Sequence, residues 1–331
     1  MGQTILKINN LNTIYKTKPK DVHAVNGLDL EIKEGETVGI VGETGAGKTT
    51  TALSIMGLLP ERTGRIIDGE IYYKGENLLK KNRRQMRKIR GSEISMVFQD
   101  PMTALDPIMP IGKQILESLK IHNYEKKSLA QLNLEVDNLL NMVGIPSQRK
   151  NEFPHQLSGG MRQRIVIAMA LACNPKLLIA DEPTTALDVT IQAQVLSMMQ
   201  DLKKRLKTSI ILITHDLGVV ANTCDSVYIM YAGRVVEKGP IQKIFEGSNH
   251  HPYTEGLFGA IPDIEAEVER LKPIEGAMPD PTNLPKGCSF YPRCKHRMEI
   301  CEKEQPKMMF DGEHGLSCFL YQKEDINGPT R

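Results

Sequence analysis

The sequence predicts an α/β fold with a largely parallel sheet. One observation is that short β-rich runs alternate with longer segments of helical periodicity. Another is that strand signals disappear between Pro101 and Pro154, which indicates a helical subdomain over about residues 101–160. Four of the six cysteines also fall within the last 44 residues, which predicts a small Cys-rich C-terminal appendage after the main domain.

The individual elements follow from these patterns. In the helical region the apolar residues recur at helical spacing, as Ile115, Leu119, Leu132 and Val136 illustrate. After Gly239 the chain becomes rich in Pro and Cys, so we place the main domain at residues 1–248 and an extension at residues 249–331. The expected strands are residues 4–8, 28–32, 37–41, 94–98, 177–180, 210–213, 227–230 and 234–237.

The composition is that of an ordinary globular protein. The 331 residues include 42 Lys and Arg against 40 Asp and Glu, so the net charge of +2 disfavours disorder and a polybasic nucleic-acid binder. The longest apolar run, residues 165–173, is nine residues long, whereas a membrane-spanning helix needs about 20. The first residues lack the apolar stretch of a signal peptide, so we expect a cytoplasmic protein with reduced cysteines.

A phosphate-binding loop is expected directly after the predicted strand 37–41. The segment GETGAGKT at residues 42–49 matches the pattern G-x-x-x-x-G-K-[ST] at every defined position. Its glycines permit a tight loop whose N–H groups face phosphate oxygens, and the dipole of the following helix also favours anions. Lys48 is placed for the β- and γ-phosphates and Thr49 for Mg²⁺. The expected ATP contacts are Gly42, Glu43, Thr44, Gly45, Ala46, Gly47, Lys48, Thr49 and Thr50.

Two carboxylates follow the predicted strand 177–180. Asp181 and Glu182 come directly after it, and a carboxylate at the carboxyl edge of a strand can lie beside a phosphate loop. There Asp181 can hold Mg²⁺ through water. Glu182 is then available as a general base or as the group that orients the attacking water. A solvated acidic pair is the alternative, which the phosphate loop in the same chain disfavours.

Further motifs make the chain resemble the ATPases of ABC transporters. The run LSGGMRQR at residues 157–164 looks like the signature sequence of that family. TALD at residues 185–188 resembles its D-loop, Gln99 its Q-loop and His215 its switch histidine. Tyr15 is similar to the aromatic residue that stacks on adenine. The resemblance covers about residues 4 to 250 and implies a P-loop ATPase core with a mixed, RecA-like sheet, an antiparallel β part and a helical subdomain.

The resemblance also implies how the site works. The helix expected after Ser158 offers a second anion-binding N-terminus, which one chain cannot easily fold onto the same phosphate. In the family two subunits pair head to tail, so that each phosphate loop faces the partner's signature motif. The implied contacts to the partner's ATP are Ser158, Gly159, Gly160 and Asp188. The implied catalytic residues are Glu182, His215, Lys48 and Gln99, and the implied magnesium ligands are Thr49, Gln99 and Asp181.

Three stretches and one residue resemble the branch of the family that imports oligopeptides and dipeptides. Met161, in place of a more usual Gln, and the run VFQDPMTALDP at residues 97–107 are similar to that branch. HHPYT at residues 250–254 and PKGCSF at residues 285–290 look like its C-terminal tail. The resemblance implies an ATP-hydrolysing subunit on the cytoplasmic face of the membrane that powers peptide uptake.

The same resemblance implies several partners. They are a second ATPase subunit, with a heterodimer preferred to a homodimer, two membrane permease subunits and, indirectly, an extracytoplasmic peptide-binding protein. The surface that couples to the permeases is expected near Gln99 and residues 101–110.

The four C-terminal cysteines form a candidate metal site. Disulfides are disfavoured in a reducing compartment, and the spacing alone leaves Zn²⁺ and an iron–sulfur cluster about equal. Family members with this tail hold a [4Fe–4S] cluster, so the resemblance favours the cluster over zinc. Unliganded thiols are a further alternative, and His296 or His314 can replace one ligand. The expected ligands are Cys288, Cys294, Cys301 and Cys318.

Other functions are weighed against this one. Nickel and oligosaccharide importers use closely similar ATPases, and the sequence does not discriminate between cargoes. A soluble ABC ATPase acting on nucleic acid or ribosomes needs a long coiled coil or two cassettes, and neither is present. Residues 80–90 carry seven Lys or Arg without interleaved aromatic residues, so we interpret them as a solvated helix face and expect no nucleic-acid partner.

Overall fold

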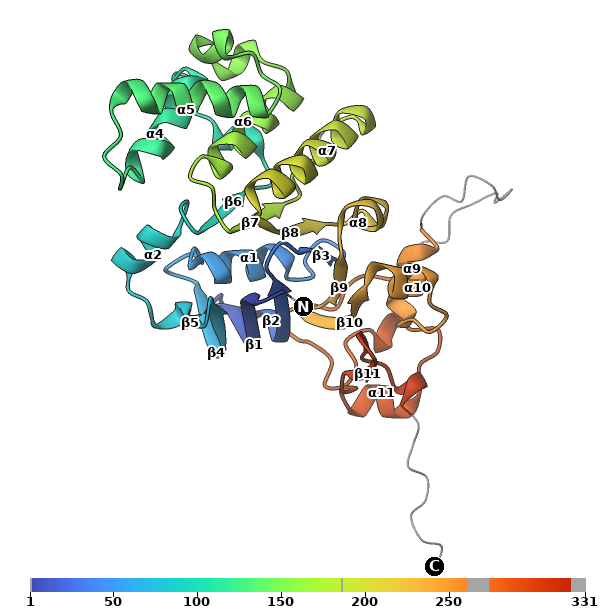
Figure 1. Ribbon diagram of the computed structural model, residues 1–331. Coiled ribbons are helices and arrows are strands. Elements are labelled where there is room, and N and C mark those ends of the chain that lie inside the picture. The colour runs from blue at the N-terminus through green and yellow to red at the C-terminus, as the bar shows by residue number, and fades with distance from the viewer. Residues whose placement is uncertain (1, 186, 261–273, 323–331) are drawn as a thin grey trace, which may run out of the picture.

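The computed structural model describes residues 2–185, 187–260 and 274–322, and its main sheet has a parallel centre (Figure 1). Within these residues the strand order is β11-β12-β10-β9-β3-β8-β7-β6, and the run from β9 to β6 is parallel. The strands are β3 (Thr37–Val41), β6 (Ile94–Val97), β7 (Leu177–Asp181), β8 (Ser209–Thr214), β9 (Ser226–Tyr231), β10 (Arg234–Pro240), β11 (Met309–Asp311) and β12 (His314–Leu316).

The central strands are buried along their whole length. Every residue of β3, β7 and β8 is buried, as expected for parallel strands that are covered on both faces. This burial explains why these strands were predicted from short continuous apolar runs. Each of the six predicted strands from residue 37 onward matches a strand of the main sheet to within three residues at each end.

A second, antiparallel sheet covers one face of the main sheet. Its order is β2-β1-β4-β5, with β1 (Thr4–Tyr15), β2 (Val22–Lys33), β4 (Gly64–Tyr73) and β5 (Glu76–Asn77). The predicted strands 4–8 and 28–32 are parts of β1 and β2. The strand β4 was missed, because Asp68 and Gly69 interrupt its apolar residues. The helix α1 (Lys48–Met56) packs in one core with both sheets.

The predicted helical subdomain is present above the main sheet (Figure 1). Its helices pack around one apolar core that includes Ile115, Leu132, Val136 and Ile165. Within the described residues, no helix is both long and apolar enough to cross a membrane. The helical elements of this region are α3 (Pro101–Ala104), α4 (Ile111–Ile121), α5 (Leu129–Met142), η2 (Ser147–Asn151), η3 (Pro154–Gln156) and α6 (Gly159–Leu171).

Besides α1, four α-helices of the described residues lie outside both that region and the C-terminal segment. α2 (Arg83–Ile89) follows the short turn η1 (Leu78–Lys80), and the cations of residues 80–90 are exposed or paired with neighbouring groups. Arg83 pairs with Glu61 and Lys81 with Glu76, while Arg90 donates to the Met56 and Gly57 carbonyls. The remaining helices are α7 (Val189–Leu206), α8 (Leu217–Thr223) and α9 (Ile241–Glu246).

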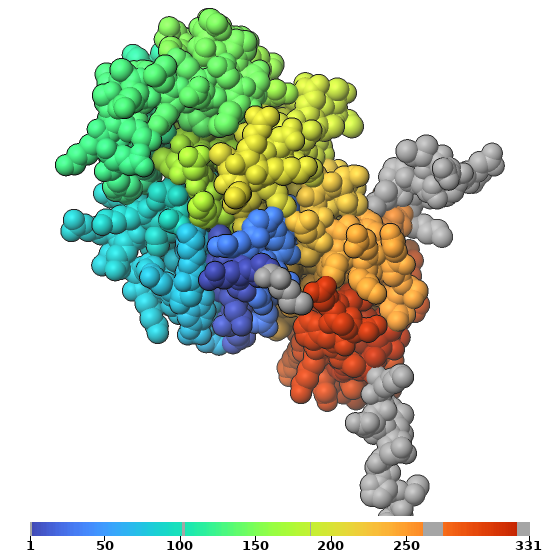
Figure 2. Space-filling model, viewed as in Figure 1, coloured from blue at the N-terminus to red at the C-terminus, as the bar shows by residue number. Residues whose placement is uncertain are grey.

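The C-terminal segment is joined to the main sheet. The strand β12 pairs with β10, and the side chain of Phe290 packs against Tyr231 and Tyr253. Figure 2 shows the later part of this segment, in red, lying against the part of the chain drawn in orange. Its elements are α10 (Pro252–Phe258), η4 (Tyr291–Arg293), α11 (Glu299–Lys303), the strands β11 and β12, and η5 (Phe319–Tyr321).

A fully buried carboxylate ties this segment to β10. One oxygen of Glu237 accepts hydrogen bonds from ring nitrogens of His250 and His314, each at 2.9 Å. The other oxygen accepts from the His251 N–H at 2.8 Å and from the Thr254 hydroxyl at 2.5 Å. A buried carboxylate without partners is costly, so these four donors favour the observed position of the C-terminal segment.

Candidate nucleotide site

The loop at residues 42–47 has a conformation that only glycine tolerates at two positions. Gly45 and Gly47 have φ values of +87° and +98°. A Cβ atom on Gly47 would lie 2.3 Å from the Ala24 carbonyl oxygen, whereas one on Gly45 would meet no atom within 4 Å. The space over Gly45 is therefore open, as a loop that binds phosphate requires.

The side chain of Lys48 lies over this loop. Its ammonium donates to the carbonyl oxygens of Gly42 at 2.6 Å and Glu43 at 3.1 Å. Burial lowers the pKa of Lys48, and the charges of Glu182, Asp181 and Glu43 oppose that shift. With three carboxylates nearby, Lys48 has the partners that favour a charged ammonium, which is the form that binds phosphate.

The residues predicted to hold magnesium lie together at the carboxyl end of β7. Asp181 is 1 % exposed, and its Oδ1 atom has no hydrogen-bond partner. Burial raises the pKa of Asp181, and a hydrogen bond from Thr49 acts in the opposite direction. An unpartnered buried carboxylate oxygen beside a hydroxyl suits a hard cation such as Mg²⁺, which prefers oxygen ligands. The residues present therefore fit the predicted ion.

Glu182 is the centre of a cluster that collects residues from neighbouring strands. Its carboxylate accepts from the Gln99 amide at 2.9 Å and from the Thr185 hydroxyl at 3.0 Å, and lies 3.4 Å from Nδ1 of His215. These residues follow β6, β7 and β8, which are neighbours in the sheet. Glu182 has a φ of +46°, an uncommon conformation for a non-glycine residue that costs about 1 to 3 kcal/mol. The fold holds its carboxylate between Gln99 and His215.

Tyr15 lies beside the helix that follows the phosphate loop. It ends β1, is half-buried, and its hydroxyl is 3.2 Å from the Thr50 hydroxyl on α1. The ring is therefore fixed next to the first turn of the helix that follows the phosphate loop. This position suits the predicted contact with a base whose phosphates bind in the loop.

The signature motif lies on the helical region, away from the phosphate loop. Ser158 caps α6, and its hydroxyl accepts from the Met161 N–H at 3.4 Å. Ser158 and Gly159 are exposed, whereas a Cβ on Gly160 would lie 2.5 Å from the Ile191 side chain. Asp188 is exposed and caps α7, while Ala186 of the predicted D-loop lies outside the described residues. Figure 1 shows α6 and α1 in different parts of the molecule.

Sequence reasoning missed two residues that reach the phosphate loop from the C-terminal segment. The Glu43 N–H donates to the Tyr253 hydroxyl at 2.9 Å, and Arg293 binds the Glu43 carboxylate through both terminal nitrogens. Tyr253 lies in the HHPYT tail motif and Arg293 directly precedes the predicted ligand Cys294, but neither feature was a reason to place the residue at the phosphate loop. Both are more than 200 residues from the loop, so no local pattern reports the contact.

The four predicted thiols lie in one part of the C-terminal segment. Cys301 and Cys318 are buried, Cys288 and Cys294 half-buried, and the Cys288 N–H donates to the Cys301 carbonyl at 2.8 Å. Burial, together with the other three thiols, raises the pKa of Cys318 to about 12. His314, named above as an alternative ligand, instead pairs with Glu237.

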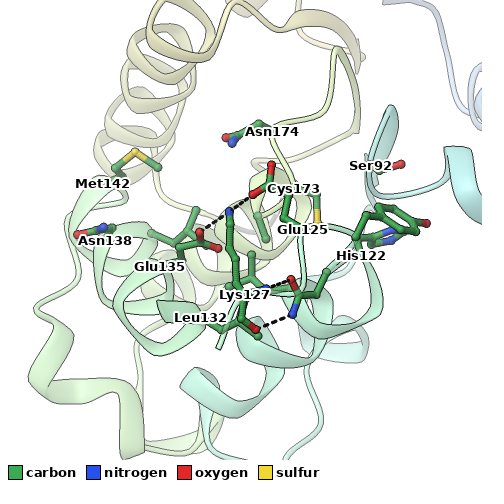
Figure 3. A pocket seen from close by; sticks show the side chains of 15 residues that line it. Ser92, His122, Glu125, Lys127, Leu132, Glu135, Asn138, Met142, Cys173 and Asn174 are labelled. Carbon is green, nitrogen blue, oxygen red and sulfur yellow. Dashed lines mark hydrogen bonds and ion pairs between the residues drawn. The ribbon is translucent and has the colours of Figure 1, made fainter. Parts of the chain in front are cut away.

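Another hollow lies in the helical region and carries none of the predicted site residues. It has a volume of about 380 Å³ between α4, α5 and the end of α6 (Figure 3). The Lys127 ammonium lies there and pairs with Glu125 and Glu135. Burial raises the pKa of the Cys173 thiol to about 11, so it is not a thiolate at neutral pH. Nothing in this hollow resembles the phosphate site.

Comparison with known proteins identifies the family. The profile described as ABC transporter matches residues 25–185, and that described as Oligopeptide/dipeptide transporter, C-terminal region, matches residues 236–301. The oligopeptide transport ATP-binding protein AppD of Bacillus subtilis is 50 % identical over 325 residues, which cover 97 % of this chain and 98 % of AppD. The chain belongs to the ABC transporter ATPases. The predicted family and its oligopeptide and dipeptide branch are thereby confirmed.

Other relatives of this ABC transporter ATPase agree. The oligopeptide transport ATP-binding protein OppD of Salmonella typhimurium is 46 % identical over 320 residues, which cover 96 % of this chain and 94 % of OppD. The ATP-binding cassette MJ0796, solved as a dimer bound to ADP and Pi, is 28 % identical with a TM-score of 0.65. That match covers 72 % of this chain and 99 % of MJ0796. The chain is therefore an ATPase of the ABC fold, a family that uses ATP and Mg²⁺.

We expect the Glu182→Gln variant to bind ATP but to hydrolyse it at least about 100-fold more slowly, because the amide cannot accept a proton from water. Phosphate release measures turnover, and titration with a fluorescent ATP analogue measures binding. Glu117→Gln, at an exposed carboxylate of α4, is the control. Normal steady-state hydrolysis by Glu182→Gln would refute this role for Glu182.

Proposed function

We propose that this ABC transporter ATPase powers the uptake of dipeptides or oligopeptides, working at the cytoplasmic face of the membrane. The observation that carries the proposal is that AppD and OppD, both named as oligopeptide transport proteins, match the chain along its ATPase region and its C-terminal region alike. Their names support peptide cargo over the nickel and oligosaccharide alternatives.

In this proposal hydrolysis uses residues that line the carboxyl edge of the sheet. Glu182 accepts a proton from the attacking water, and Gln99 and His215, which bracket its carboxylate, orient that water and respond to the γ-phosphate. Lys48 stabilises the charge that develops on the phosphate oxygens. Asp181 and Thr49 hold Mg²⁺, which neutralises phosphate charge when it is bound.

The proposed site is completed by a second ATPase subunit. The exposed N-terminus of α6, with Ser158 and Gly159, lies in the helical region and not at the phosphate loop of its own chain. A helix N-terminus of a partner can bind the γ-phosphate from the opposite side, with Asp188 near the interface. The dimer of MJ0796 bound to ADP and Pi supports pairing of cassettes. We favour a different ATPase chain as the partner, with a second copy as the alternative.

An apolar groove next to Gln99 is the proposed contact with a membrane permease. It has a volume of about 460 Å³, and Ala104, Val166, Met169 and Ile121 are among its lining residues. The Phe98 side chain is 45 % exposed and that of Ile121 61 %, an unusual exposure for large apolar side chains that line one groove. Because Phe98 precedes Gln99, a permease segment seated here can sense the nucleotide state. Two permeases, served by an extracytoplasmic peptide-binding protein, complete the proposed importer.

Ile121→Asp should separate the ATPase from its permeases, because it places a charge in the apolar groove. We expect the variant to hydrolyse ATP at the rate of the wild-type chain assayed under the same conditions, but to lose about tenfold or more in the amount of permease that co-purifies from detergent-extracted native membranes, measured by mass spectrometry. Leu134→Asp is the matched control, since Leu134 is 63 % exposed on α5 and does not line the groove.

Recovery of normal amounts of permease with Ile121→Asp would refute the groove as the contact. Recovery of the wild-type chain with nucleic acid or ribosomes, and without permeases, would refute the transport function itself.

We also propose that the four cysteines hold a [4Fe–4S] cluster that stabilises the C-terminal segment. Burial and the nearby thiols of Cys288, Cys294 and Cys301 together raise the pKa of Cys318, which supports one group bound by all four sulfur atoms. Cysteine thiolates are the usual ligands of iron–sulfur clusters, and Zn²⁺ is the alternative. When bound, such a cluster cross-links chain segments that have little apolar core of their own.

We expect the anaerobically purified wild-type chain to contain iron and acid-labile sulfide and to absorb visible light. Cys301→Ser should lose this absorption and most of the iron, because Cys301 is one of the four proposed ligands. Cys224→Ser, at a thiol outside the group, should keep both. One equivalent of zinc with no iron, or wild-type protein without metal, would overturn the cluster.

A further inference from the structure

Glu43, in the phosphate loop, makes hydrogen bonds through its carboxylate, its N–H and its carbonyl oxygen. Its carboxylate accepts from Arg293 Nη1 at 2.6 Å and Nη2 at 3.1 Å. Its N–H donates to the Tyr253 hydroxyl at 2.9 Å, and its carbonyl oxygen accepts from Lys48 at 3.1 Å. The loop pattern requires no particular residue at this position, yet two of these three partners come from the C-terminal segment.

The guanidinium of Arg293 donates hydrogen bonds from all three of its nitrogen atoms. Besides the two bonds to Glu43, Nε donates to the Glu275 carbonyl at 3.0 Å and Nη2 to the Ile274 carbonyl at 3.1 Å. Nη1 also donates to the Tyr231 hydroxyl at 3.4 Å. These five bonds match the five N–H groups of a guanidinium, and the side chain is only 4 % exposed. Lysine cannot reproduce this planar arrangement.

The charge of Glu43 gives the contact a consequence for nucleotide binding. A carboxylate in the phosphate loop repels the phosphates of ATP unless a cation neutralises it. Lys48 interacts with the backbone of Glu43, and Arg293 is the cation bound to its carboxylate. The pair thus offsets an unfavourable charge and fixes the second residue of the loop in one position.

We propose that Arg293 is a positioning residue for the phosphate loop, which it holds ready for Mg²⁺-bound ATP through Glu43. The C-terminal segment is then part of the nucleotide site and more than a peripheral appendage. Arg293 acts through Glu43, to which it donates two hydrogen bonds, and its own side chain is buried. The inference rests on the proposed ATPase site, and binding and turnover are measured separately in its test.

The test is a double-mutant cycle on the full-length chain, with affinity measured by titration of a fluorescent ATP analogue and Mg²⁺. We expect Arg293→Gln to raise the Kd about tenfold, with kcat at saturating ATP changed less than about twofold. Adding Glu43→Gln should bring the Kd back to within about threefold of wild type, since the unpaired carboxylate is gone. Arg293→Lys keeps the charge but not the two parallel hydrogen bonds, so its Kd should lie between those of the wild type and Arg293→Gln.

Controls separate this role from loss of structure. Arg297→Gln, at an exposed arginine of the same segment, should bind like wild type. If Arg293→Gln binds like wild type, or if Glu43→Gln does not restore its affinity, Arg293 only anchors the C-terminal segment and the proposal is wrong. If the wild-type chain itself does not bind ATP, that result refutes the proposed function and not only the role of Arg293. A cooperative melt of each variant shows that it is folded.

Discussion

The parallel pairing of β3, β8, β7 and β6 is the constraint on which the nucleotide site depends. Because parallel strands end at the same edge of the sheet, this order places the phosphate loop, His215, Asp181 with Glu182, and Gln99 side by side. These central strands are buried on both faces, so packed side chains support the edge from either side. The surrounding structure stabilises the hydrogen-bonded cluster around Glu182 and offsets the strain of that residue's left-handed backbone.

The same sheet carries the C-terminal segment. β12 extends it beyond β10, and the buried carboxylate of Glu237 binds donors from four residues of that segment. This attachment brings Tyr253 and Arg293 to the phosphate loop. Since Arg293 lies one residue before Cys294, the proposed metal site and the nucleotide site are joined by a short chain of contacts. The signature motif, by contrast, stays on the helical region, which leaves its exposed helix N-terminus for a partner.

Much of this architecture can be predicted from the sequence, and the exceptions have physical reasons. Fully buried parallel strands produce continuous apolar runs, so β3 and β7 were located together with the residues that follow them. Glycine and Asp68 break the pattern of β4, and β11 and β12 are too short to produce one. The contacts of Arg293 with Glu43 depend on tertiary packing across 250 residues, which no local pattern reports. The left-handed backbone of Glu182 is likewise imposed by its surroundings.

The central claim is that a single chain holds only half of a working ATP site. The most direct measurement is the ATPase rate per molecule over a dilution series, with light scattering recording the mass of the species present. We expect the ATPase rate per molecule to fall as the assemblies dissociate, or hydrolysis to be absent until the partner ATPase is added. A monomer that hydrolyses ATP at the same rate per molecule at every dilution would contradict the account.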